Sequence, residues 1–276
     1  MPELIEVEVY RRVAEQAVGR RIAEVRTPDT WYLKGTTAAE LVAALTGATV
    51  TGTRRIGKLL MLDTDADHVL GLRFGMTGRL IVDERNVAEG GNNRGDRAGS
   101  ADVLIGDLMY GSKRDEPEWD RFTMRFRDGG VLRMQDPRRL GGVELDPEEA
   151  RLGPEASTIT TAALREVLAG STTALKARLM DQHRLAGMGN LLVDETLWRA
   201  GLDPAREAGS LSASEVRQLA AKVRSTIAQL SDRGGSHTGD LQIARTRGAL
   251  CPRDGAALLR RTIGGRTTFS CPVHQR

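Results

Sequence analysis

The sequence has few of the features that mark extracellular or membrane proteins. It contains only two cysteines, Cys251 and Cys271, which excludes a disulfide framework and favours a reducing compartment. No apolar run approaches the roughly 20 residues needed to span a bilayer, and Met1-Pro2-Glu3 does not begin a signal peptide. The 31 glycines and 9 prolines follow no period and 40% of residues are hydrophobic, which excludes collagen and disorder. We therefore expect a cytoplasmic globular protein with no membrane partner.

Charge is distributed unevenly along the 276 residues. The net charge is only +3, but residues 241–276 contain seven arginines and one aspartate, a net charge of +6. The other 240 residues therefore carry −3. Arginine without lysine favours bidentate contacts with phosphates, although charge alone is equally compatible with a solvated charged face. Nucleic acid is the leading partner class.

Hydrophobic periodicity in the first half predicts short strands behind one leading helix. A helical stripe covers Glu3–Val18, and a second helix is expected over Thr37–Leu45, opened by Thr36 or Thr37. This order is typical of an α+β fold that has an N-terminal β-sandwich with a leading helix. The expected strands are Arg21–Val25, Thr49–Arg54, Leu59–Asp63, Val69–Phe74, Arg79–Val82, Phe122–Phe126, Val131–Met134 and Gly142–Leu145.

The second half is expected to be helical and to end in a hairpin. Glu84–Asp120 is rich in glycine, asparagine and charge, and we interpret it as a mobile insertion. Because the pattern changes near residue 150, we expect domains over 1–150, 151–240 and 241–276. The hairpin is expected to turn at Gly264-Gly265. The expected helices are Thr161–Ala169, Thr173–Met180, Leu191–Ala200 and Ser212–Leu230.

The N-terminus carries the first residues that suggest chemistry. Methionine removal would leave Pro2 first in the chain, and its secondary amine can attack an aldehydic carbon to form an iminium. An α-amine has a pKa of about 8, below that of lysine, so more of it is neutral at pH 7. Glu3 and Glu6 share a helical face and suit an acid/base group and a positioning carboxylate. An ordinary helix start, with acids near its positive end, is the alternative.

A basic turn and two loops suggest contacts with nucleic acid. Lys58 follows Gly57 in a basic turn and can hold a phosphate, or it is an ordinary solvated lysine. Met76, in a glycine-flanked loop, and Arg138, in Asp136-Pro137-Arg138-Arg139-Leu140, suit the filling of a gap left by an everted base. A core methionine and an ion-paired arginine are the alternatives.

A glycine turn precedes one of the expected helices. Gly187 and Gly189 permit a backbone to approach a phosphate closely. Asn190 then starts a helix, and the free amides of a helix start favour anions. An ordinary turn between two helices is the alternative.

The tail contains two short motifs at the spacing of a zinc ribbon. They are Cys251-Pro252-Arg253-Asp254 and Cys271-Pro272-Val273-His274. Asp254 and His274 stand where two further thiolates are expected, and both residue types can ligate zinc. A hairpin that holds together by apolar packing, without metal, is the alternative.

Taken together and in this order, the motifs resemble the formamidopyrimidine-DNA glycosylase/endonuclease VIII (Fpg/Nei) family over nearly the whole chain. The resemblance implies a helix–two-turn–helix domain at the glycine turn and a zinc-ribbon-like β-hairpin after it. It implies catalysis by Pro2 as nucleophile on the sugar C1′, with Glu3 as acid/base, Glu6 supporting the site and Lys58 on the lesion strand. It implies that Met76, Arg138 and Leu140 enter duplex DNA, that Lys176, Asn190 and Arg266 grip phosphates, and that Cys251, Asp254, Cys271 and His274 hold a structural zinc.

The sequence also departs from the family pattern. Leu140 stands where the family usually has an intercalating aromatic residue, and two zinc thiolates are replaced. Only fifteen residues separate Gly235 from Cys251, fewer than in members that excise 8-oxoguanine. Oxidised purines and oxidised pyrimidines therefore both stay open as substrates.

The resemblance implies a monomeric, bifunctional DNA glycosylase/AP lyase of base-excision repair, in the bacterial cytoplasm with the nucleoid. Its partner would be double-stranded DNA with oxidised bases or abasic sites, cut by β- and δ-elimination. A non-catalytic binder of damaged DNA and a lyase for abasic sites only are the alternatives. The presence of Pro2, Glu3, Glu6 and Lys58 together argues against the binder, which needs none of them.

Overall fold

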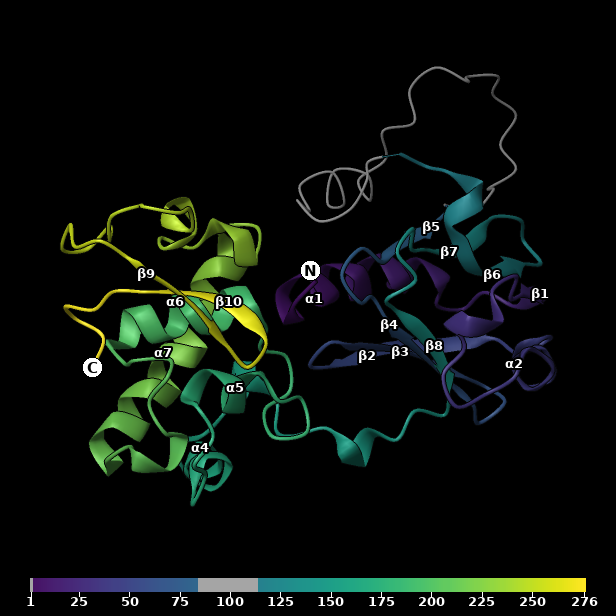
Figure 1. The fold of residues 1–276 in the computed structure, drawn as a ribbon. Coiled ribbons are helices and arrows are strands. Elements are labelled where there is room, and N and C mark those ends of the chain that lie inside the picture. The colour runs from purple at the N-terminus through teal and green to yellow at the C-terminus, as the bar shows by residue number, and fades with distance from the viewer. Residues whose placement is uncertain (1, 84–113) are drawn as a thin grey trace. The chain divides into compact units, whose positions relative to one another are not determined.

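The computed structural model describes residues 2–83 and 114–276 (Figure 1). These residues form two compact units. The first comprises Pro2 with residues 6–83 and 114–148, and the second comprises residues 3–5 and 149–276. In the part of the chain that the structure describes, no helix is both long and apolar enough to cross a membrane.

The first unit is built on two four-stranded antiparallel sheets. One has the strand order β1-β6-β7-β5 and the other has the order β2-β3-β4-β8. Leu60 and Leu72 from the second sheet share one buried apolar core with Phe122 and Leu132 from the first, which confirms the expected β-sandwich. The strands are β1 (Ile22–Arg26), β2 (Val50–Ile56), β3 (Leu59–Thr64), β4 (Val69–Arg73), β5 (Arg79–Val82), β6 (Asp120–Phe126), β7 (Val131–Gln135) and β8 (Gly142–Leu145).

Helix α1 (Leu4–Ala14) precedes the sheets, as the sequence predicts. Val7 and Tyr10 face the core of the sandwich, where the Tyr10 ring stacks on Phe74 with 4.3 Å between ring centroids. The α-helix ends earlier than expected, because residues 15–17 tighten into a 3₁₀ turn and Val18 is extended. The short helix α2 (Ala38–Leu45) follows β1, and the side chain of Thr37 caps it.

The end of the expected insertion is ordered. Residues 84–113 lie outside the described residues, so only 114–120 can be compared with the expectation. Asp115 pairs with Arg133 of β7 at 2.7 Å, and the Gln135 side chain donates hydrogen bonds to Asp115 and Asp120 at 2.8 Å each. These contacts tie 115–120 to β7, and β6 begins at Asp120. The expected insertion was therefore too long at its C-terminal end.

The second unit contains four helices at the expected places, apart from shifts at their ends. Leu4 and Ile5 from the start of α1 are buried in its core, beside Leu192 and Leu197. Thr160 caps the first helix, and a capping box opens the last. The helices are α4 (Thr161–Leu168), α5 (Leu175–Met180), α6 (Asn190–Ala200) and α7 (Ala213–Asp232).

The described chain ends in a β-hairpin of β9 (Leu259–Ile263) and β10 (Arg266–Ser270), yellow in Figure 1. Gly264 and Gly265 have φ of +56° and +71°, values that side chains with a Cβ rarely adopt. Two consecutive left-handed residues are the geometry of a tight two-residue turn, as the sequence predicts.

Candidate functional site

The carboxylate of Glu3 lies at the N-terminal end of α6 and is fully buried. It accepts hydrogen bonds from the backbone amides of Gly189 at 2.9 Å, Leu191 at 2.8 Å and Leu192 at 3.1 Å. A helix leaves its first amides without internal partners, and its dipole is positive at this end. The arrangement therefore stabilises a negative charge on the residue that follows Pro2.

Two glycines before α6 make this contact possible. A Cβ atom on Gly189 would lie 2.4 Å from Glu3 Cδ, so only glycine lets the carboxylate approach. Gly187 has a φ of +108°, and its carbonyl accepts a hydrogen bond from the Leu4 amide at 3.2 Å. The Gln182 side chain closes the turn by accepting from the Gly187 amide at 3.0 Å. The anion that the glycine turn binds in this structure is thus a carboxylate of the chain itself.

The other residues expected around the nucleophile lie on three different elements. Glu6 is buried in α1 and belongs to the first unit. Lys58 is partly exposed in the turn between β2 and β3, directly after Gly57, whose φ is +55°. Asn190 is the first residue of α6 in the second unit and is partly buried. Within each unit, these residues stand at the start of a helix or in a tight turn.

Asp136 is fully buried and connects the two loops that the resemblance places in the duplex. Its Oδ1 accepts hydrogen bonds from the Thr77 hydroxyl at 2.6 Å and the Arg138 amide at 3.2 Å. Its Oδ2 accepts from the amides of Leu140 at 2.9 Å and Gly141 at 2.8 Å. Four hydrogen bonds to one carboxylate fix the loops against each other. Sequence reasoning gave Asp136 no role, although Asp-Pro is a turn signal that could have drawn attention to it.

The side chains expected to enter DNA stay at the surface of these loops. Leu140 is 49% exposed, Arg138 is exposed and Met76 is partly buried. Gly75 has a φ of +56°, and a Cβ atom there would lie 2.3 Å from the Leu140 carbonyl carbon. The backbone at Gly75, next to Met76, is therefore in direct contact with the backbone of Leu140.

Lys176 cannot reach a phosphate in this structure. Its ammonium is fully buried, pairs with Asp194 of α6 at 2.7 Å and donates to the Thr268 hydroxyl at 2.8 Å. Burial lowers the pKa of Lys176, and the Asp194 charge opposes that shift. The structure thus gives Lys176 an internal ion pair in place of the expected phosphate contact, which the salt dependence of DNA binding would test. Its ion pair ties α5 to α6 and to β10, which the amino-acid sequence does not indicate.

Arg266 is exposed as the first residue of β10, directly after the hairpin turn. The turn packs on α5, since a Cβ atom on Gly264 would lie 3.0 Å from the Ala177 Cβ. Asp194 also pairs with Arg245, so one buried carboxylate connects α5, α6 and the segment before the hairpin. These contacts hold Arg266 at the tip of a well-anchored hairpin.

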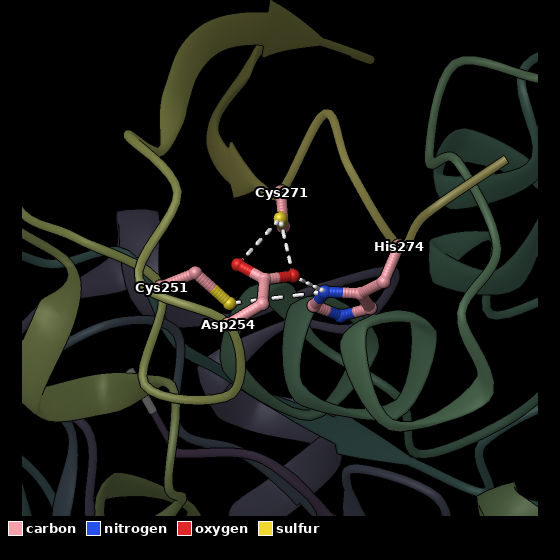
Figure 2. A group of neighbouring side chains, drawn as sticks. All are labelled: Cys251, Asp254, Cys271 and His274. Carbon is pink, nitrogen blue, oxygen red and sulfur yellow. Dashed lines mark hydrogen bonds and ion pairs between the residues drawn. The ribbon is translucent and has the colours of Figure 1, made fainter.

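The four expected metal ligands lie together at the base of the hairpin. Figure 2 shows Cys251, Asp254, Cys271 and His274 facing one another, and their ligand atoms all lie within 4.8 Å of each other. Tetrahedral zinc with bonds of about 2.0–2.3 Å separates its ligands by about 3.4–3.8 Å. The Cys251 Sγ to His274 Nδ1 distance is 3.8 Å and Cys271 Sγ to Asp254 Oδ2 is 3.2 Å. The set therefore fits a metal of this size after small side-chain shifts.

Neighbouring groups orient these side chains. The His274 Nε2 lies 3.3 Å from the Trp198 carbonyl, so an Nε2–H can donate there while Nδ1 faces the cluster. The Trp198 indole N–H lies 3.3 Å from Cys251 Sγ. The close approach of the His274 ring to Asp254 lowers the pKa of that carboxyl, which keeps it ionised.

Comparison with known proteins agrees with this geometry. Residues 1–143 match the formamidopyrimidine-DNA glycosylase N-terminal domain, and residues 152–240 match the formamidopyrimidine-DNA glycosylase H2TH domain. The formamidopyrimidine-DNA glycosylase of Paracoccus denitrificans is 33% identical over 303 residues, and that of Xanthomonas campestris pv. campestris strain 8004 is 34% identical over 301 residues. Each alignment covers 100% of both chains.

Solved structures are similar over the same extent. The Lactococcus lactis enzyme bound non-covalently to DNA with an AP site has a TM-score of 0.80, 28% identity and 100% coverage of both chains. The same enzyme in complex with Fapy-dG-containing DNA has a TM-score of 0.78 and 28% identity, covering 99% of this chain and 100% of the other. The N-terminal sandwich, the helical unit with its glycine turn and the terminal hairpin are thus accounted for together: the chain belongs to the formamidopyrimidine-DNA glycosylase (Fpg/Nei) family of base-excision repair enzymes.

Proposed function

We propose that this glycosylase is bifunctional: it removes oxidised bases from double-stranded DNA and cuts the strand at the resulting or pre-existing abasic sites. The observation that carries the proposal is the buried carboxylate of Glu3, the residue that follows Pro2 in the sequence, which three amides at the start of α6 fix in place. A fixed carboxylate on the residue after a secondary amine can stabilise an iminium and exchange protons with the sugar. Solved relatives bound to AP-site and Fapy-dG DNA support this class of substrate.

The first steps use Pro2 and Glu3. After removal of Met1, the Pro2 nitrogen attacks the sugar C1′, and the bond from C1′ to the base breaks with its electron pair leaving on the base, which takes up a proton from water. The Glu3 carboxylate accepts the proton that the Pro2 nitrogen loses and passes it to the ring oxygen as the C1′–O4′ bond breaks and the sugar opens. The product is an iminium between Pro2 and C1′, which serves as the electron sink for the later steps.

Strand cleavage follows from the iminium. Glu3 as carboxylate accepts the C2′ proton, and the C3′–O bond breaks with its electron pair leaving on the 3′ phosphate. Loss of a C4′ proton then breaks the C5′–O bond and releases the 5′ phosphate. Water hydrolyses the conjugated iminium and restores the Pro2 amine. Glu6 would support the site, and Lys58 would contact the lesion strand.

DNA is held, in this proposal, by residues from both units. Asn190, at the start of α6, and Arg266, at the tip of the hairpin, would bind phosphates that flank the lesion. Met76, Arg138 and Leu140 would occupy the space that the everted nucleotide leaves. Residues 151–240 and 241–276 would thus act as two phosphate-binding parts beside the N-terminal domain 1–150.

Borohydride trapping tests the chemistry directly, because it reduces an iminium to a stable protein–DNA adduct. The duplexes should carry an abasic site, 8-oxoguanine, a formamidopyrimidine or an oxidised pyrimidine, and the intact mass of each protein sample reports Met1. We expect trapping by protein that begins at Pro2 and strongly reduced trapping and cleavage by Pro2→Gly, whose DNA affinity stays within a few-fold. Efficient trapping by protein that fully keeps Met1 would exclude Pro2 as the nucleophile.

The same duplexes separate the proposal from its two alternatives. Trapping on the abasic duplex alone, with no base released from the others, would assign a lyase for abasic sites. Binding of all four duplexes without any adduct would assign a damaged-DNA binder. Release of an oxidised base together with an adduct is the outcome we expect.

We also propose that the cluster of Cys251, Asp254, Cys271 and His274 binds a structural zinc. Zinc would supply no chemistry to the reaction and would fix the base of the hairpin that carries Arg266. Without metal, the hairpin would depend on apolar contacts such as those of Ile263 and Phe269, which are buried. Metal analysis after gel filtration should give one equivalent, lost in Cys271→Ser. Less than about a tenth of an equivalent in fully active protein would show a metal-free hairpin.

A further inference from the structure

Trp31 is a large aromatic side chain left at the surface of the first unit. It is 68% exposed, whereas Trp198 is buried and Trp119 is partly buried. It lies in a 3₁₀ turn (Thr30–Tyr32) between β1 and α2. A single exposed apolar residue is ordinary by itself, so the surroundings of Trp31 decide what it means.

Asp29 fastens the Trp31 turn to the loop that carries Arg138 and Leu140. Its carboxylate accepts a hydrogen bond from the Trp31 amide at 3.1 Å. The same carboxylate accepts two from the Arg139 guanidinium, at 2.6 Å and 2.7 Å, and this pairing lowers the pKa of Asp29. Asp29 is 9% exposed, so the bidentate pair is shielded from water on one side.

Backbone contacts reinforce the link between the two segments. The Lys34 amide donates to the Val143 carbonyl at 2.8 Å. A Cβ atom on Gly141 would lie 2.4 Å from the Tyr32 hydroxyl oxygen, so the two segments of the chain touch there. Arg139 has a φ of +57°, an uncommon value for a residue other than glycine, and its pair with Asp29 holds that conformation. The Trp31 turn is therefore fixed to the segment that runs from Arg139 to Val143.

The chemistry around Trp31 favours a ligand that is both aromatic and anionic. The Lys34 Nζ lies 5.2 Å from the centroid of the indole ring and donates to the Trp31 carbonyl at 2.9 Å. The exposed side chains of Arg138 and Arg139 belong to the adjacent loop. A nucleic-acid strand offers base faces to the ring and phosphates to Lys34 and Arg138, whereas an apolar protein surface offers these two cations no anionic group.

We propose that Trp31 stacks on a DNA base left unpaired where Arg138 and Leu140 enter the duplex. Leu140 cannot stack, and Trp31 supplies an exposed aromatic face on a turn that is fixed to the same loop through Asp29 and Arg139. Lys34 contributes by placing its charge near the phosphate of the stacked nucleotide. The inference rests on the proposed function, since it requires that this loop enters damaged DNA.

Tryptophan emission and DNA affinity test the proposal in the full chain. Trp31→Phe, Trp31→Ala and the control Trp119→Phe should be titrated with a duplex that carries an abasic site and with the intact duplex. We expect the abasic duplex to quench the emission of wild type and Trp119→Phe, and most of this quenching to be lost in Trp31→Phe. We expect roughly tenfold weaker binding of the abasic duplex by Trp31→Ala, with Trp31→Phe within about threefold of wild type, since base stacking contributes about 1–3 kcal/mol.

Two results would overturn the inference, and one separate result concerns the function. Equal quenching in Trp31→Phe and wild type, or affinity of Trp31→Ala within twofold of wild type, shows that no base stacks on Trp31. Unchanged circular dichroism and melting temperature exclude misfolding of these surface variants. Borohydride trapping by wild type is measured in parallel. Failure of the wild-type protein to bind the abasic duplex or to form an adduct with it would refute the proposed function. Normal trapping by wild type, together with wild-type quenching and affinity in the Trp31 variants, would refute only the stacking.

Discussion

Substitution of Glu3 separates its capping of α6 from its role in the reaction. The Oε2 atom accepts from the amides of Gly189 and Leu192, and Oε1 accepts from the amide of Leu191. Glu3→Gln can keep its oxygen at the Oε2 position, so it loses one hydrogen bond. Glu3→Ala loses all three and leaves buried amides without partners. We expect the free energy of unfolding to fall by about 1–2 kcal/mol in the Glu3→Gln variant and by about 3 kcal/mol or more in the Glu3→Ala variant.

The catalytic effect should not follow this order. Loss of a proton-transfer group costs about a hundredfold or more in rate, and Gln and Ala both lack it, so cleavage should fall similarly in both variants. DNA affinity of Glu3→Gln should stay within a few-fold of wild type. Hydrogen exchange of the Leu191 and Leu192 amides reports the cap, and strand cleavage under single turnover reports the chemistry. Full cleavage by Glu3→Gln, or unchanged exchange in Glu3→Ala, would refute the corresponding half of the reasoning.

Three further predictions concern charge. Lys176→Met should lower the free energy of unfolding by about 3 kcal/mol, because it removes one of the positive charges that neutralise the buried Asp194 carboxylate. The salt dependence of DNA binding by the folded variant should not change. Arg266→Ala should instead leave stability nearly unchanged, weaken binding to all sequences and reduce the slope of log K against log salt by about 1; an unchanged slope would place Arg266 away from phosphate. The hydrogen bond from Arg206 lowers the pKa of Glu215 from 4.5 to about 2. The stabilising effect of Glu215 should therefore be present above pH 4.5 and disappear as the pH falls towards 2, so urea midpoints of wild type and Glu215→Gln should converge at that end.

Local patterns predict much of the architecture because they depend on nearby residues. The turn at Gly264-Gly265 requires two left-handed conformations in succession, which glycine alone adopts without strain. The start of α2 follows from the capping box of Thr37 and Glu40. By contrast, the C-terminal end of the insertion was misplaced, since Asp115 is held by contacts with Arg133 and Gln135, residues 18 and 20 positions away in the sequence.

The sequence by itself determined the family and the order of its motifs, because each motif is short and its chemistry is set by residue type. It also indicated which four donor residues gather in the tail, since two knuckles of fixed spacing bring them together. Only the tertiary structure decided where charges are neutralised. Lys176 meets Asp194 inside the second unit, Asp136 gathers two loops, and Asp29 fastens the Trp31 turn to Arg139. An ionised group is costly to bury unless it is paired or hydrogen-bonded, and the fold can bring that partner from any distance along the sequence.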